Sequence, residues 1–196
     1  MGAELLPMVF TSGWASGVNA YAVVLLLGLF GRFADVEAVP GALQRTDVLV
    51  VAAILFAIEA VADKIPYLDS TWDAVHTFIR PVIGAAIGAL LAGDATSLEQ
   101  AVLAATGGAT ALASHAVKAG VRAAVNTSPE PASNIAVSTA EDLTVAGVIT
   151  LGVVQPWLAA GLALSLLVIG MVLVFLTLSR IRAARARRRD RRPAVS

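Results

Sequence analysis

The sequence contains no cysteine, which excludes disulfides, thiolate chemistry, haem attachment through cysteine and cysteine-ligated iron–sulfur clusters. Charged residues are also scarce: they make up 14% of the chain, whereas about a quarter of the residues in a soluble domain are charged. Hydrophobic residues account for 58% of the chain, and the mean hydropathy is +0.81. This composition excludes an ordinary soluble protein and indicates an integral membrane protein.

The sequence motifs of soluble enzymes are missing as well. There is no GxxxxGK phosphate loop and no GxSxG nucleophile elbow, and the two histidines lack the HxxxH or HxxE spacing of a metal site. We therefore expect no enzyme, no cofactor, no metal and no nucleic-acid partner. The first residues, MGAELLPMVF, hold no basic region, so we do not expect a cleaved signal peptide.

Six apolar segments predict an all-α, polytopic membrane helix bundle with about six transmembrane helices, since a spanning helix needs about 20 mainly apolar residues. The segments lie near 4–31, 47–63, 79–93, 98–118, 142–155 and 157–179. Gln155, Pro156 and Trp157 divide the last two, because proline cannot donate a backbone hydrogen bond and tryptophan favours the membrane surface. Residues 1–179 then form one transmembrane domain.

Arginine is concentrated at the end of the chain, where residues 180–196 hold eight of the fourteen basic residues. We expect this segment to be a disordered cytoplasmic tail that fixes topology and meets anionic lipid headgroups. Six spans then place both termini on the cytoplasmic side of the inner (plasma) membrane. The basic loops after the second and fourth spans fall on that side too, and the loops at 32–45 and 94–99 fall outside.

The most highly charged part of the apolar body is EAVADKIPYLDSTWDAVHTFIRP, at 59–81. Four titratable residues in it recur at helical spacing and would share one face of a helix: Asp69, Asp73, His76 and Arg80. We call these four the acidic stripe, after its two aspartates. A basic stripe in the fourth span consists of His115, Lys118 and Arg122. We expect these two stripes to pair on facing helices.

Depth in the membrane selects the strongest functional candidates. Glu59 lies about 18 Å from the outer end of its span at 1.5 Å per residue, and His115 is comparably deep. An ionisable group there costs about 2.5–3.5 kcal/mol and persists only when paired or hydrated. For the remaining charged residues, the alternative interpretation is that they form a solvated, salt-bridged layer on the cytoplasmic side. The transport-path candidates are Asn19, Tyr21, Glu59, Asp63, Asp69, Asp73, His76, Arg80, His115, Lys118, Arg122, Glu141 and Asp142.

The first span contains an interruption, FTSGWASGVNAYAV at 10–23. Its small residues allow close helix approach, and Asn19 and Tyr21 bring polar groups to about mid-bilayer depth. A broken helix at that depth is tolerated only inside protein or beside a water-filled cavity. The alternative is that the small residues are packing notches and Asn19 bonds a neighbouring backbone.

A polar group, SNIAVSTAED at 133–142, precedes the fifth span. Ser138 or Thr139 ahead of Glu141 reads as a helix N-cap, with acids in the first turn. Similar spacing in Ser70 and Thr71 ahead of the third span predicts an internal two-helix repeat, related by an axis along the membrane normal.

The combination of SGVNAY, EAVADKIPYLDSTWDAVHTFIRP, HAVKAGVR and STAED resembles one bacterial integral-membrane family, catalogued as domain of unknown function 4126. The likeness covers about residues 5–178. It implies a multi-span inner-membrane protein of prokaryotic type and implies no reaction.

Two functions remain open on the charges alone. The first is a small transporter or channel with a polar path near the cytoplasmic side, in which His115 beside a carboxylate relays protons; a homodimer is expected if the pathway is sizeable. The second is a non-transporting scaffold or interaction protein, whose charges hold the helices in register. A weaker third is a lipid-headgroup enzyme using Asp69, Asp73 and His76.

Overall fold

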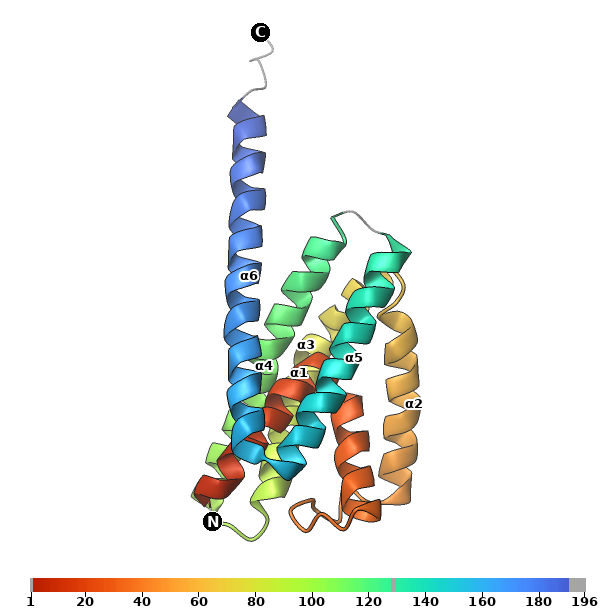
Figure 1. The fold of residues 1–196 in the computed structure, drawn as a ribbon, viewed down its shortest axis with the longest axis vertical. Helices are drawn as coiled ribbons and strands as arrows, with labels where there is room; N and C mark the ends of the chain where they lie inside the picture. The colour runs from red at the N-terminus through yellow and green to blue at the C-terminus, as the bar shows by residue number, and fades with distance from the viewer. Residues whose placement is uncertain (1, 128–129, 191–196) are drawn as a thin grey trace.

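The computed structural model describes residues 2–127 and 130–190, with no β-strand among them. They form six helices (Figure 1): α1 Gly2–Phe33, α2 Thr46–Ala62, α3 Leu68–Ala92, α4 Ser97–Val125, α5 Pro131–Val154 and α6 Pro156–Asp190. Of these, α1, α3, α5 and α6 are long and apolar enough to cross a membrane. The predicted all-α class is confirmed, and the composition and the helices together indicate a membrane protein.

Two helices begin earlier than expected. α3 starts at Leu68 and α5 at Pro131, so Ser138 lies inside a helix and is no N-cap. The starts at 79 and 142 were expected from where the apolar stretches begin, and both helices extend about ten residues further toward the N-terminus. In the structure these residues belong to the helices, and the buried ones among them include Asp69, Asp73 and His76 on α3 and Asn134 and Ser138 on α5. The predicted break at Gln155 is confirmed, since α5 ends at Val154 and α6 begins at Pro156.

α1 folds back on itself at Asn19, whose backbone is non-helical (φ −149°, ψ 96°). Residues 2–18 rise along α4, with Gly13 against Gly107 and the Val18 carbonyl bonded to Lys118. Residues 20–33 descend again, so that Gly28 packs against Leu49 near the start of α2. The second half of α1 therefore returns toward the end of the bundle at which the first half begins (Figure 1).

The interruption predicted within the first apolar segment is confirmed at Asn19, and we call the folded-back α1 the hairpin. In Figure 1 the start of α1 and the α1–α2 loop lie at the lower end of the bundle, and α6 extends beyond the opposite, upper end. The prediction that both termini lie on the cytoplasmic side stays untested. The α2–α3 and α4–α5 connections lie at the upper end.

α3 and α4 form the most extensive helix pair. A methyl group at Gly84, Gly88 or Gly107 would overlap backbone atoms of the facing helix, so these glycines permit the close approach. Apolar side chains, Ile87 and Leu103 among them, fill the surrounding core. The two stripes of charged residues on α3 and α4 are thereby held face to face.

The C-terminal helix continues past residue 179 to Asp190, and residues 191–196 lie outside the described part of the chain. The tail's role in topology and lipid contact stays a prediction.

The hairpin predicts a specific labelling pattern, which the cysteine-free chain makes easy to read. Single cysteines at Ala3→Cys and Gly41→Cys should react with a membrane-impermeant maleimide from the same side of sealed vesicles, because both flank the hairpin. Thr127→Cys, between α4 and α5, should react from the other side. Labelling of the first two positions from opposite sides would instead mean that α1 crosses the membrane.

Candidate functional site

Eight charged side chains lie together inside the upper half of the bundle, on α2, α3, α4 and α5 around the bend of α1. We call them the buried charge network; its members are Glu59, Asp63, Asp69, Asp73, Glu141, Arg80, Lys118 and Arg122. Seven of them are at most 3% exposed, and the Glu141 side chain is 16% exposed. The expected acidic and basic stripes therefore face each other inside the protein and form no solvated surface layer.

Arg80 connects four helices from the centre of the network. Its Nη2 donates to Glu59 Oε1 on α2 at 2.5 Å, and its Nη1 lies 2.9 Å from Asp73 Oδ1 on its own helix. Nη1 also donates to His115 Nδ1 on α4 at 2.7 Å and to the Gly17 carbonyl of α1 at 3.3 Å. A planar guanidinium with five donors is suited to bridging so many acceptors.

Lys118 lies nearer the upper end of the bundle than Arg80 does, and it contacts four carboxylates. Its Nζ is 2.5 Å from Asp63 Oδ2, 3.6 Å from Glu141 Oε2, 3.7 Å from Glu59 Oε1 and 4.0 Å from Asp73 Oδ1. It also donates to the Val18 carbonyl at 2.9 Å. A single ammonium ion is therefore shared among several acids.

Arg122 closes the network toward the upper end. Its Nη2 pairs with Glu141 Oε2 at 2.5 Å and its Nη1 donates to the Asp63 backbone carbonyl at 2.8 Å. Asp69 lies 3.8 Å from the same guanidinium and accepts from the side-chain amides of Asn126 and Asn134. This amide layer separates the charges from the α4–α5 loop.

The network holds more negative than positive groups. Five carboxylates face three basic side chains, which leaves two negative charges uncompensated if every acid is ionised. Adding the half-buried Asp142 and Lys64 leaves this excess unchanged. Because uncompensated buried charge is very costly, protons or a bound cation must balance the excess.

Several carboxylate oxygens are consistent with that conclusion. Glu59 Oε2, Asp63 Oδ1 and Asp73 Oδ2 are buried and have no hydrogen-bond donor among the described residues. A buried acceptor without a donor is costly, whereas a protonated carboxyl or an ordered water would satisfy it. Among the described residues, no group of three or more His, Asp or Glu side chains is arranged so that it could hold a metal ion.

The bend of α1 is built into this site. The Asn19 side chain accepts from the Ala22 amide at 3.0 Å, as an N-cap does for the descending half, and donates to Asp142 Oδ1 at 3.0 Å. The ascending half ends with the Gly17 and Val18 carbonyls turned toward Arg80 and Lys118. Cations at a helix C-terminus are favoured by its dipole.

Tyr21 and His76 form a second polar contact just past the bend. His76 Nδ1 lies 2.8 Å from the Trp72 carbonyl, which can only accept, so this nitrogen carries a proton. In the neutral ring, Nε2 then accepts from the Tyr21 hydroxyl at 2.9 Å. The ring also stacks on Trp72 with centroids 4.5 Å apart.

His115 does not occupy the position that the expected proton relay requires. Its Nδ1 accepts from Arg80, and its Nε2 lies 3.0 Å from the Thr77 hydroxyl, which itself donates to the Asp73 carbonyl. Nε2 must therefore carry the proton, and both nitrogens are occupied. Glu59 and His115 meet only through Arg80, whose guanidinium does not release protons in proteins. A direct histidine-to-carboxylate relay is not formed in this arrangement.

Some members of the site were missed from the sequence. Asn126 and Asn134 were assigned to a loop and its flank, yet they cap the network through Asp69. Ser114, which donates to the Trp14 carbonyl at 2.6 Å, fixes the hairpin against α4. Ser114 lies four residues before Lys118 and Asn126 lies four residues after Arg122, so extending the basic stripe by one turn at each end would have found both. Asn134 lies four residues before Ser138 and seven before Glu141, so the same helical spacing would have found it too.

The pairing predicts a large stability difference between buried and exposed arginines. Arg80→Gln should lower the free energy of unfolding by about 3–5 kcal/mol, because it leaves Glu59 buried and unpaired. Adding Glu59→Gln to it should recover part of the loss. Chemical denaturation in mixed micelles measures both.

The matched control is Arg45→Gln, which breaks the Arg45–Asp47 pair, whose side chains are 66% and 62% exposed. Solvent screens such a pair, so the midpoint should stay close to that of the native chain. Equal effects of Arg80→Gln and Arg45→Gln would contradict the buried network.

Comparison with known proteins places the chain in a family. No curated protein and no solved structure matches it significantly. The family model described as Domain of unknown function (DUF4126) matches residues 6–175, which include the whole buried charge network and the hairpin of α1. The resemblance noted in the sequence is thereby confirmed, and the chain belongs to the DUF4126 family.

Proposed function

We propose that this protein is a small proton-coupled membrane transporter, in which the buried charge network binds and releases protons as a solute moves. The observation that carries the proposal is the excess of two carboxylates over basic side chains in a buried site. A network whose only role was packing would need no more acids than cations. Ionisable groups at membrane depth commonly mark ion and proton pathways.

The re-entrant α1 supports the same proposal. Non-helical backbone within a membrane is tolerated where protein or water surrounds it, and broken helices of transporters place their ends at the binding site. Here the bend at Asn19 puts two carbonyls and an amide side chain against the network. The hairpin is thus positioned to move when the charge of the network changes.

Two pockets approach the network from different directions. One, of about 290 Å³, is lined by Lys118 and Glu141 near the upper end. The other, of about 340 Å³, lies between the descending half of α1, α2 and α3, and is lined by Tyr21 and Asp47. The Tyr21–His76 hydrogen bond separates this second pocket from the network. Alternating access would open one approach while the other is closed.

For topology, we propose that α2–α6 cross the inner membrane and α1 enters and leaves on one side. The Arg-rich segment then assigns the upper end to the cytoplasm and the N-terminus to the outside. The expected count of six spans changes to five with one hairpin. The two-helix repeat, the homodimer and the lipid contact of the tail stay predictions.

The second candidate is a non-transporting scaffold. The observation that favours it is that Arg80 links α1, α2, α3 and α4 through a single guanidinium. Such cross-linking holds helices in register whether or not anything is transported. It does not account for the surplus carboxylates.

Proton flux separates the two candidates. In sealed proteoliposomes under an imposed pH gradient, the native chain should acidify or alkalinise the lumen faster than empty vesicles do. Glu59→Gln and Asp73→Asn should each slow this flux at least about tenfold, because each removes a group that can carry a proton in the path.

Asp94→Asn, on the exposed α3–α4 loop, is the matched control and should leave the flux unchanged. A pH-sensitive dye trapped in the lumen reports the rate, and thermal unfolding confirms that each variant is folded. Equal flux in native, variant and empty vesicles would overturn proton conduction and favour the scaffold.

A further inference from the structure

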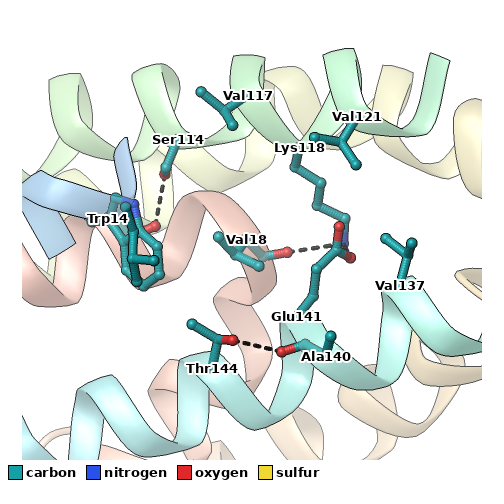
Figure 2. Close-up of a pocket in the computed structure, with 11 residues that line it drawn as sticks. Trp14, Val18, Ser114, Val117, Lys118, Val121, Val137, Ala140, Glu141 and Thr144 are labelled. Carbon is teal, nitrogen blue, oxygen red and sulfur yellow. Dashed lines mark hydrogen bonds and ion pairs between the residues drawn. The ribbon is translucent and has the colours of Figure 1, made fainter. Parts of the chain in front are cut away.

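The pocket beside Glu141 combines an apolar body with a charged end. Figure 2 shows Trp14 and Val117 on one side of it, Val137 on the other, and Lys118 and Glu141 meeting beside the Val18 carbonyl. Its volume of about 290 Å³ is close to the lower limit of small-molecule sites, about 300 Å³. A compact solute with one polar end fits this shape.

Glu141 is the member of the network best placed to meet a ligand. Its side chain is the most exposed of the network carboxylates, at 16%. Arg122 and Lys118 both contact its Oε2 atom, and among the described residues nothing donates to Oε1. One carboxylate oxygen therefore remains available at the charged end of the pocket.

The charge of the surroundings selects the sign of the ligand. Lys118 is already shared among Asp63, Glu59 and Glu141, and the network as a whole carries the two uncompensated negative charges. A bound cation would reduce this excess, whereas a carboxylate or a phosphate would increase it. A phospholipid headgroup is disfavoured for the same reason.

The apolar walls select the rest of the molecule. Trp14, Val121, Val137 and Leu166 come from four different helices and surround the remainder of the pocket. α4 and α5 touch only slightly, so the pocket lies where two helices are loosely packed.

We propose that this pocket binds a small organic ammonium ion with an apolar body, the ammonium group lying against Glu141 and the body against Trp14. This rests on the proposed function, since it names the solute class for the same network. Entry of the cation supplies positive charge that protons otherwise supply, so binding of the cation and release of a proton are coupled.

The test is calorimetric titration of the purified full chain, in neutral maltoside micelles, with benzyltrimethylammonium. Its uncharged carbon isostere, neopentylbenzene, has the same shape and is the control ligand. We expect saturable binding of the cation, and binding of the isostere at least about tenfold weaker, because the isostere lacks the positive charge that the Glu141 carboxylate attracts.

Three variants locate the site. Glu141→Gln should weaken binding of the cation about tenfold, and Val137→Trp should abolish it by filling the pocket. Ile58→Trp lies in a larger groove of about 540 Å³ beside α2, lined by apolar side chains, and should leave binding unchanged. If Glu141→Gln fails to fold, Val137→Trp and the isostere still test the assignment.

Equal binding of the cation and the isostere would overturn the charge selection, and binding unaffected by Val137→Trp would overturn the location. Absence of saturable binding to the native chain would overturn the inference even if proton flux is present. Binding as expected without proton flux in vesicles would instead sink the transport proposal and leave the ammonium site intact.

Discussion

The ion pair between Arg80 and Glu59 is the interaction on which the rest of the structure depends. Both side chains are fully buried, so neither tolerates loss of the other. The same guanidinium reaches α4 through His115 and the bend of α1 through the Gly17 carbonyl. The hairpin, the α3–α4 pair and α2 are therefore positioned around one charged group, and this geometry sets where the remaining carboxylates must lie.

The buried charge network around this ion pair has a surplus of negative charge. Three basic side chains supply too little charge for the five carboxylates around them. A site of this kind is sensitive to whatever cation is present, because binding of a proton and binding of another cation both reduce the same excess. Exchange of a cation for protons needs such competition, and the ammonium ion proposed for the pocket beside Glu141 would lie where that competition takes place.

The sequence was informative where periodicity and charge coincide. Asp69, Asp73, His76 and Arg80 were predicted to share a helix face, and the structure buries all four on α3. The path of α1 was not predictable in the same way. The hydropathy of this segment indicates only that it is long and apolar enough to cross a membrane. Asn19 and its small neighbours are the one sign of a break in the helix. Whether the chain continues or turns back at that break depends on the contacts of Gly17 and Val18 with charged residues distant in the sequence. Helix starts failed for a related reason, because polar residues resemble loops until their buried partners are known.

The most direct test of this account is the protonation state of the network at neutral pH. Infrared difference spectroscopy of the purified protein in lipid, with and without Glu59→Gln or Asp73→Asn, detects the carbonyl stretch of protonated carboxyl groups. The account predicts such a band in the native protein in the absence of an organic cation. It also predicts that these substitutions alter the band and that benzyltrimethylammonium reduces it. A network whose five carboxylates are all ionised, with no band under any of these conditions, would contradict proton storage at this site.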